Sequence, residues 1–460
     1  MIHRTRMPWG RRALFLGCAL VALALGRPVE AQTLEEALAR AYQTNPTLDS
    51  QRAQLRATDE LVPQALSGYR PTVDLNGFAG RTKAEARAAG GTRNSVTTPR
   101  GASIELNQPL YRGGSTGASV RGAEARVQAQ RANLLLTEGD VLLTAATAYL
   151  DVVRDQSVLD LNRNNETVLR RQLDASRDRF NVGEITRTDV SQAEARLSRA
   201  NADRIQAEGR LRASRAAYQR AVGELPGVLT APRPRFQLPA TLDEVIALAQ
   251  SNNPGVTAAE YAELAANAGI DRIEGEGYPQ VSLSAELARS YDGSATADRS
   301  DSASLTANLR IPLYSAGLLS ARVREAKHQA NQARIQIEGA RRQVVENAIR
   351  AWEALITARA AIESRRTQVR AAEIALEGVR QEAQVGSRTT LDTLNAEQEL
   401  LDARVGLVSV QRDETVAAFQ VLEATGQLNA RQLGLPVQYY DFESHYREVR
   451  DQWWGTDIRQ

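Results

Sequence analysis

Four short segments of the chain alternate apolar and polar residues with a period of two. They are residues 72–80, 102–110, 281–287 and 303–311. In the last segment, Leu305 and Leu309 alternate with Thr306. This period predicts β-strands with one apolar and one polar face, arranged as two hairpins at about 71–111 and about 279–314. Such strands fit either a half-buried soluble sheet or a transmembrane sheet whose apolar face meets lipid.

The segments that connect the paired strands are polar. Residues 84–100 and 292–301 are rich in Gly, Ser, Thr and Asp. This composition is typical of exposed loops, so we expect a loop between the strands of each hairpin.

Two very long stretches have a helical period instead. They run over about 115–181 and about 318–384, which gives helices of about 100 Å at 1.5 Å per residue. Shorter helical patterns at about 188–222 and 390–425 return after a Val-Gly turn. Rods of this length cannot surround a globular core, so we expect them to pack side by side as an extended bundle or coiled coil.

The second half of the chain repeats the first. Gly183 recurs as Gly386 and Asp189 recurs as Asp392, a constant spacing of 203 residues. This self-similarity predicts an internally duplicated fold. The repeats span 32–223 and 241–430, and a Pro-rich linker spans 224–240. Residues 431–460 form a tail that we expect to be a docked or partly ordered terminus and not an aromatic ligand site.

The N-terminal residues 1–31 have the pattern of a secretory signal peptide. Four arginines precede an apolar run from Ala13 to Leu25, and Ala31 offers a cleavage site. The single cysteine, Cys18, lies inside this run. Lipidation at Cys18 is disfavoured, because Phe15 stands where a lipoprotein signal needs a small aliphatic residue. Cleavage after Ala31 would leave a mature chain without thiols.

Composition excludes several classes of function. The formal net charge of +2 argues against nucleic acid as a partner. After signal removal only His328 and His445 remain, and neither has a ligand partner at helical spacing. No nucleophile, phosphate-binding or metal motif is present, so we expect neither an enzyme nor a cofactor.

The sequence resembles the TolC family of outer-membrane efflux and type I secretion channels. The resemblance rests on the duplicated order of elements and on short motifs that recur in it. These are Thr-Ala-Tyr-Leu at 147–150, Arg-Phe-Asn-Val-Gly at 179–183, the two Thr/Asp turns, and Pro-Leu-Tyr at 109–111 and 312–314.

The resemblance implies a mainly α fold with β, located in the outer membrane of a Gram-negative bacterium. Four strands per protomer would join a transmembrane β-barrel in a homotrimer, continued by a long periplasmic α-helical barrel. Four strands alone cannot close a barrel, so pairing between copies is expected from the residues as well; the number three comes from the resemblance.

The resemblance also implies the function. The channel would dock with a periplasmic adaptor and an inner-membrane ABC or other pump. It would then export proteins, small toxic compounds or both, as a passive conduit. The alternative is a non-conducting periplasmic coiled-coil tether or adaptor, for which lipid-facing strands would have no use.

The two helical turns carry a local prediction of their own. Thr186 with Asp189, and Thr389 with Asp392, have the spacing of a capping box at the start of the returning helices. Gly183 is a natural terminator of the long helix before it. This structural role accounts for both turns without any gate.

The resemblance adds a gate to these turns. Three copies of Asp392 would form an anionic ring at the periplasmic constriction, where such a ring binds cations. A second aspartate of the family pattern is replaced by Asn395, which weakens the expected cation block. Arg388 would tie this turn to Thr188 and Asp189, or else remain a solvated charge.

The resemblance assigns two further sets of positions. The expected adaptor-contact tips are Val182, Gly183, Val385 and Gly386. The expected junctions between strands and helices are Pro109, Tyr111, Pro312 and Tyr314.

Overall fold

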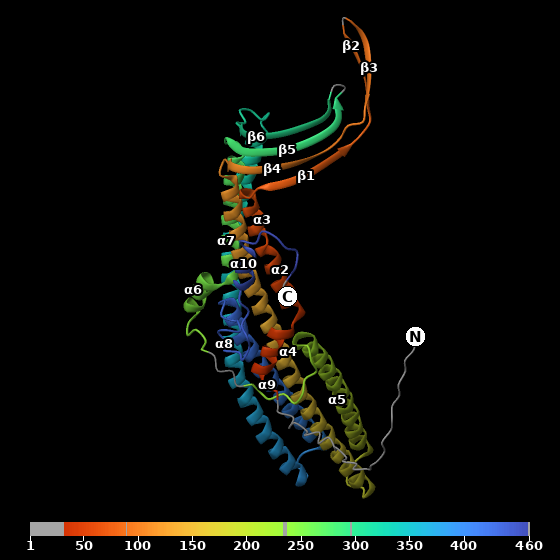
Figure 1. Cartoon of the computed structure of the whole chain (residues 1–460). Helices are drawn as coiled ribbons and strands as arrows, with labels where there is room; N and C mark the ends of the chain where they lie inside the picture. Colours follow the sequence, from red (N-terminus) through yellow and green to blue (C-terminus); the bar gives the residue numbers. More distant parts are fainter. Residues whose placement is uncertain (1–31, 89, 233–236, 295–296, 459–460) are drawn as a thin grey trace, which may run out of the picture.

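The protein is elongated, with a curved β-sheet at one end and helices over the rest of its length (Figure 1). The computed structural model describes residues 32–88, 90–232, 237–294 and 297–458. The predicted signal peptide, residues 1–31 with Cys18, lies outside the described residues. The prediction of a mainly α fold with β is confirmed.

Each half begins with short helices. The first half has α1 (Leu34–Thr44), α2 (Pro46–Asp59), α3 (Leu61–Leu66) and a 3-10 turn (Ser67–Tyr69), and the second half has α6 (Leu242–Asn252) and α7 (Pro254–Gly275). In both halves an asparagine caps the second helix. The side-chain oxygens of Asn45 and Asn253 each accept a hydrogen bond from the backbone N–H two residues further along the chain. The proline that follows each asparagine occupies the first helical turn, where its missing N–H costs nothing.

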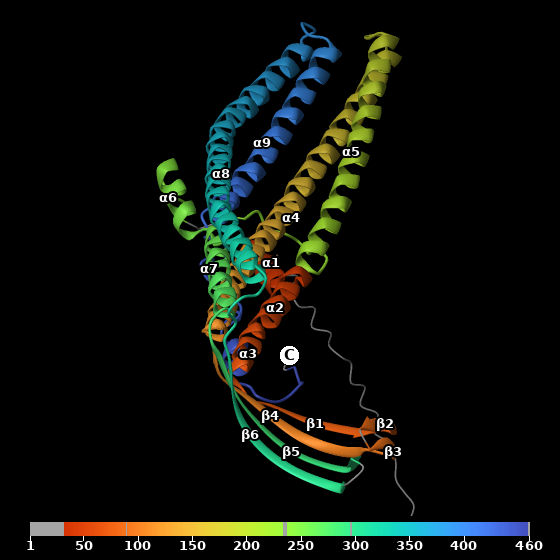
Figure 2. The ribbon, with the colours of Figure 1, turned by 90° about the horizontal axis from the view of Figure 1, so that it is seen from above.

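Two long helices, α4 (Ser115–Asn181) and α8 (Leu318–Gln384), extend away from the sheet and contain 67 residues each. The returning helices α5 (Arg187–Val222) and α9 (Thr390–Ala424) pack on them as two hairpins (Figure 2). Apolar residues fill the seam of each hairpin: Leu169 and Ala200 belong to one buried cluster in the first hairpin, and Leu376 and Ala403 to another in the second. Across the described residues, no helix combines the length and apolar character needed to cross a membrane.

The main core lies midway along the helices, where α1, α4, α5 and α9 meet. Tyr149, Tyr218 and Phe419 are its largest fully buried side chains. The Tyr149 hydroxyl is 2.8 Å from the carbonyl oxygens of both Gln32 and Thr230. This position ties the start of the first repeat and the segment after α5 to the same long helix.

The curved sheet contains strands from both halves. Its antiparallel order is β1 (Thr72–Ala79), β4 (Arg100–Arg112), β5 (Gln280–Ser294) and β6 (Ala297–Arg310). The central β4–β5 pair joins the two repeats. Val73, Leu75, Leu305 and Leu309 are all more than 60% exposed, so these apolar positions of the alternating pattern are not covered within the protomer.

The prediction of polar loops between the strands was wrong in large part. Within 84–100, the strands β2 (Thr82–Ala88) and β3 (Gly91–Thr97) form a separate hairpin. Within 292–301, β5 continues to Ser294 and β6 starts at Ala297. These polar residues are extended because strand pairing continues along the antiparallel ladder. Side-chain contacts support this pairing: Asp301 binds Arg289 at 2.7 Å, and Thr98 donates a hydrogen bond to Asp292.

The C-terminal tail docks on the first repeat, which is one of the two expected alternatives. Its helix α10 (Ser444–Val449) lies against α2. There, His445 Nδ1 is 3.2 Å from the buried carboxylate of Asp59, and the Arg131 guanidinium stacks over the Tyr446 ring. The tail therefore packs across α2 and α4 instead of extending into solvent.

Candidate gate at the helical hairpin ends

The two hairpin ends have the same backbone. At the first, the N–H groups of Gly183 and Glu184 donate to the carbonyls of Phe180 and Arg179. At the second, Gly386 and Ser387 donate to Ala383 and Glu382. This is the Schellman pattern. It needs the left-handed φ of +79° at Gly183 and +80° at Gly386, a conformation that glycine adopts without a steric penalty. The two glycines end the long helices, as predicted.

The returning helices begin with the two predicted capping boxes. The Thr186 hydroxyl accepts a hydrogen bond from the Asp189 N–H. In return, the Asp189 carboxylate accepts a hydrogen bond from the Thr186 N–H at 3.0 Å. Thr389 and Asp392 repeat the arrangement, with the same 3.0 Å distance. Hydrogen bonds from the Thr389 N–H and hydroxyl lower the pKa of the Asp392 carboxyl. Asp392 therefore carries its negative charge at neutral pH.

Each turn also carries one ion pair, but its charges are exchanged between the halves. In the first half, Arg179 at the end of the helix binds Glu184 at 2.7 Å. In the second half, Glu382 at the equivalent helical position binds Arg388 at 2.7 Å. The turn geometry that ends the helix brings both partners together.

The predicted tie between Arg388 and the first-half turn is not formed within the described protomer. Arg388 donates to Glu382 on its own hairpin. Thr188 and Asp189 lie in the first turn of α5, on the other hairpin. A nearby carboxylate on the same turn satisfies Arg388 without any approach of the two hairpins.

Asn395, in contrast, makes a polar contact between the two hairpins near their ends. Arg196 on α5 donates to Asn395 Oδ1 on α9 at 2.6 Å. Sequence reasoning missed Arg196, although its position seven residues after Asp189 places it on the same helical face, two turns further along. The neutral residue that departs from the family pattern thus has a specific partner in this chain.

The tips of the hairpins are the most exposed apolar positions of the helical region. Val182 is 78% exposed and Val385 is 81% exposed. Each valine precedes the left-handed glycine, so it projects from the end of its hairpin. Each hairpin thus ends in an apolar side chain that is uncovered within the protomer.

The predicted junctions differ between the halves. Pro109 and Tyr111 lie inside β4, where a register shift leaves Leu110 bulged between them. Pro312 and Tyr314 follow the end of β6, and Tyr314 is 87% exposed. The two strands end opposite the same residue of β5: Arg112 of β4 and Arg310 of β6 both pair with Gln280, the first residue of β5. Pro109 and Tyr111 precede that end and Pro312 and Tyr314 follow it.

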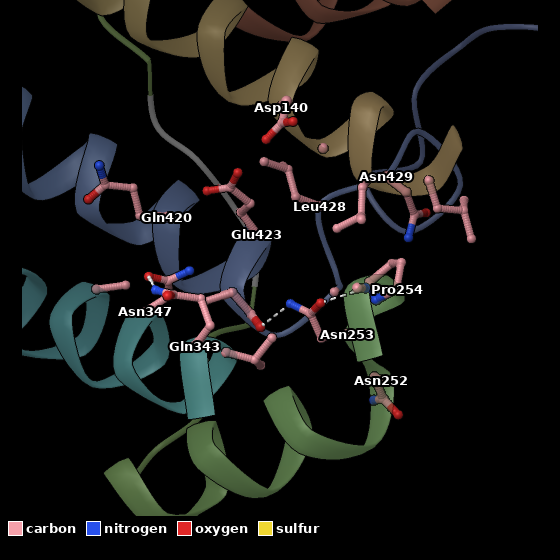
Figure 3. Close-up of a pocket in the computed structure, with 18 of the residues that line it drawn as sticks. Asp140, Asn252, Asn253, Pro254, Gln343, Asn347, Gln420, Glu423, Leu428 and Asn429 are labelled. Carbon is pink, nitrogen blue, oxygen red and sulfur yellow. Dashed lines mark hydrogen bonds between the residues drawn. The ribbon is translucent and has the colours of Figure 1, made fainter. Parts of the chain in front are cut away.

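A cavity of about 690 Å³ lies where α4, α7, α8 and α9 meet (Figure 3). Asp140 of α4 and Glu423 of α9 face each other in it. Burial and the neighbouring Asp140 raise the pKa of Glu423 to about 7. Asn253 closes another side by donating to the carbonyl of Ala424. Within the described part of the chain, no group of three His, Cys, Asp or Glu residues could hold a metal ion.

Known proteins share both this sequence and this fold. The family model "Outer membrane efflux protein" matches residues 37–224 and 245–427. The "Outer membrane efflux protein BepC" of Brucella suis is 38% identical over 94% of this chain and 93% of its own. "Outer membrane protein TolC" of Vibrio cholerae is 28% identical over 90% of this chain and 95% of its own.

Solved structures agree on the fold. The Campylobacter jejuni CmeC outer membrane channel superposes with a TM-score of 0.79 at 15% identity, covering 91% of this chain and 89% of that one. The relatives support the channel over the alternative of a non-conducting tether. The chain belongs to the outer membrane efflux protein family and is an outer-membrane channel of the TolC type.

Proposed function

We propose that three copies of the chain assemble around one axis, so that their curved sheets close into a single ring of strands in the outer membrane. The edges of the sheet carry this proposal. Within the described residues, β1 and β6 each pair on one side only, and unpaired strand edges seek partners. Cyclic symmetry lets β6 of one copy pair with β1 of the next. The exposed Leu75 and Leu305 would then face lipid.

The same symmetry places the helical hairpins around a shared passage on the periplasmic side. The hairpin ends, remote from the sheet (Figure 1), then form the constriction of the conduit. Three Asp392 carboxylates would give it a negative charge that attracts cations. The lowered pKa of Asp392 supports a ring that stays ionised.

The exposed tips support a docking role. Val182 with Gly183, and Val385 with Gly386, would contact a periplasmic adaptor that connects the channel to an inner-membrane pump. The conduit itself would be passive, with selection made by the pump. The name of the BepC relative, an efflux protein, favours small toxic compounds as cargo, and secreted proteins are the second candidate.

The conduit is tested by single-channel recording of the mature protein in planar bilayers. We expect stable conductance steps, with block by hexamminecobalt added on the side of the hairpin ends. Chemical cross-linking of the same sample should give a trimer. Insertion without conductance at any voltage, together with a cross-linked species other than a trimer, would contradict the proposal.

A further inference from the structure

The two junctions between strand and helix are covered to different extents. The first, between β4 and α4, packs against the end of α7. A Cβ at Gly113 would lie 2.1 Å from the carbonyl oxygen of Gly275 and 2.8 Å from the Cβ of Tyr278. At the second junction, between β6 and α8, Leu313 is 92% exposed and Tyr314 is 87% exposed. Within the described part of one copy, these two side chains stay uncovered.

The internal duplication predicts which surface covers the second junction. The start of β5 repeats the start of β1 at a spacing of 208 residues, and the end of β6 repeats the end of β4 at a spacing of 203. Val281 of β5 pairs with Tyr111 of β4, and their counterparts are Val73 of β1 and Tyr314. In the proposed ring, β1 pairs with β6 of the next copy as β5 pairs with β4. Repeating the pair across copies places Val73 beside Tyr314 of the next copy.

The backbone of the two junctions supports this equivalence. Gly113 and its counterpart Ala316 both adopt the left-handed conformation, with φ of +62° and +52°, so the chain bends in the same way at both places. The side chain packed on Gly113 is that of Tyr278, whose counterpart at the spacing of 208 residues is Arg70. Arg70 of one copy is therefore expected to lie against Ala316 of the next.

The C-terminal tail is fastened to this same arginine. The Arg70 guanidinium donates to the carbonyl of Gln452 at 2.6 Å and stacks 4.8 Å from the centre of the Trp453 ring. The Gln452 amide in turn donates to the carbonyl of Trp454 at 2.8 Å. Trp453 is 61% exposed and Trp454 is 87% exposed. Two indole rings are thus uncovered beside the residue that the duplication places at the next copy.

We infer that Trp453 and Trp454 form a clasp that packs on Leu313 and Tyr314 of the adjacent subunit, with Arg70 as its positioning residue. The inference rests on the ring of three copies proposed above. Each copy has one clasp and one uncovered junction, so cyclic symmetry satisfies both at every interface.

The chemistry of the two surfaces is complementary. Both are apolar and aromatic, and contact would remove them from water together. Tryptophan and tyrosine are enriched among the side chains that contribute most to subunit interfaces. The stack on Arg70 leaves the other side of the Trp453 ring free to meet a partner. A tail outside the duplicated repeats would thereby strengthen the contact between copies.

The first test is covalent. The only native cysteine, Cys18, lies in the predicted signal peptide, so Leu313→Cys with Trp454→Cys can be bridged by a short bifunctional thiol reagent with a reducible linkage. We expect covalent dimers and trimers on a denaturing gel, which reductant returns to monomers. Bridging only within single chains would overturn the clasp.

The matched control pairs Trp454→Cys with Leu110→Cys, the first-half counterpart of Leu313. Leu110 lies in β4, which pairs with β1 and β5 of its own copy. This pair should give no covalent trimer. A trimer as abundant as that from the 313–454 pair would overturn the clasp, because the bridging would then be unspecific.

The second test measures how fast trimers dissociate on heating in detergent. Trp453→Ala with Trp454→Ala should raise the rate by roughly tenfold or more, as expected for loss of central interface side chains. Arg70→Ala should raise it by a factor of roughly 2 to 5, through loss of the stack. The control is Tyr439→Ala, which removes a tail aromatic ring that also stacks with an arginine, Arg431, and should leave the rate unchanged.

The outcomes separate the clasp from the ring. Wild-type trimers that neither bridge through 313 and 454 nor weaken in the tryptophan variant would overturn the clasp and leave the ring intact. Quenching of the tail tryptophans by brominated phospholipids, in a Trp352→Phe background, would assign the tail to the membrane surface and overturn the clasp as well. Absence of any wild-type trimer would overturn the ring, and the clasp with it.

Discussion

The Asp392 carboxylate accepts hydrogen bonds from both the backbone N–H and the hydroxyl of Thr389, at 3.0 and 2.8 Å. One aspartate therefore completes a helix cap and also presents a fixed negative charge at the hairpin end. These two roles can be separated, because the threonine contributes to the cap and carries no charge.

Asp392→Asn should abolish most of the block by hexamminecobalt, because the amide keeps a hydrogen-bond acceptor for the cap and loses the negative charge. The blocking concentration should rise by roughly tenfold or more. Thr389→Ala should destabilise the cap by about 1 kcal/mol and leave the block unchanged. Blocking concentration in planar bilayers and thermal unfolding check the pair. Equal block in wild type and Asp392→Asn would restrict Asp392 to its structural role.

The Glu423–Asp140 pair predicts a pH dependence of stability. The pKa of Glu423 is raised from 4.5 to about 7 in the folded protein. Between these values the folded state binds more protons than the unfolded state, so the free energy of unfolding falls as pH rises from about 4.5 to about 7. Glu423→Gln should remove this contribution and be more stable than wild type at pH values above the window.

Denaturant unfolding at several pH values measures this effect. Asp140→Asn is the companion variant, because loss of the neighbouring carboxyl should move the decline in stability to lower pH. Identical pH profiles for wild type and Glu423→Gln would show that the pair makes no contribution to stability.

The junction glycines predict a contrast between neighbours. Gly113 and Gly114 both have positive φ, +62° and +82°, so alanine at either should cost about 1–2 kcal/mol in backbone strain. A Cβ at Gly113 would also lie 2.1 Å from the carbonyl oxygen of Gly275, whereas a Cβ at Gly114 meets nothing within 4 Å. Gly113→Ala should therefore be markedly less stable than Gly114→Ala in thermal unfolding. Equal losses would contradict the close approach of the β4–α4 junction to α7.

The Tyr149 hydroxyl predicts a measurable loss on its removal. Tyr149→Phe leaves the carbonyls of Gln32 and Thr230 without this donor, and we expect destabilisation by about 1–3 kcal/mol. Tyr314→Phe, at a side chain that is 87% exposed, serves as the control and should change stability little. The free energy of unfolding from denaturant titration distinguishes the two.

Much of this architecture could be predicted because its signals are local. The left-handed glycines, the capping boxes at Thr186 and Thr389, and the period-two strands are all encoded within a few residues of one another. The duplication strengthens the prediction of these elements, because each signal occurs twice in the chain. These features depend on backbone conformation, which short-range sequence specifies.

The contacts between distant segments could not be predicted in the same way. The resemblance ties Arg388 to the first-half turn, whereas within the described protomer it binds Glu382 of its own hairpin. Arg196 gave no signal of its partner Asn395, because their meeting depends on how two long hairpins pack. The β2–β3 hairpin was mistaken for a loop, since its polar residues resemble a loop in composition and are held extended by pairing.

The exchanged ion pairs at the hairpin ends, Arg179 with Glu184 and Glu382 with Arg388, have a consequence for recognition. The duplication repeats one backbone shape, so a partner that reads shape alone would meet two interchangeable surfaces. The two surfaces differ in charge, because the helical partner of the ion pair is basic at the first end and acidic at the second. Each protomer thus has two hairpin ends with the same backbone shape and different charge distributions, so a partner that bound both ends would do so in a single rotational orientation.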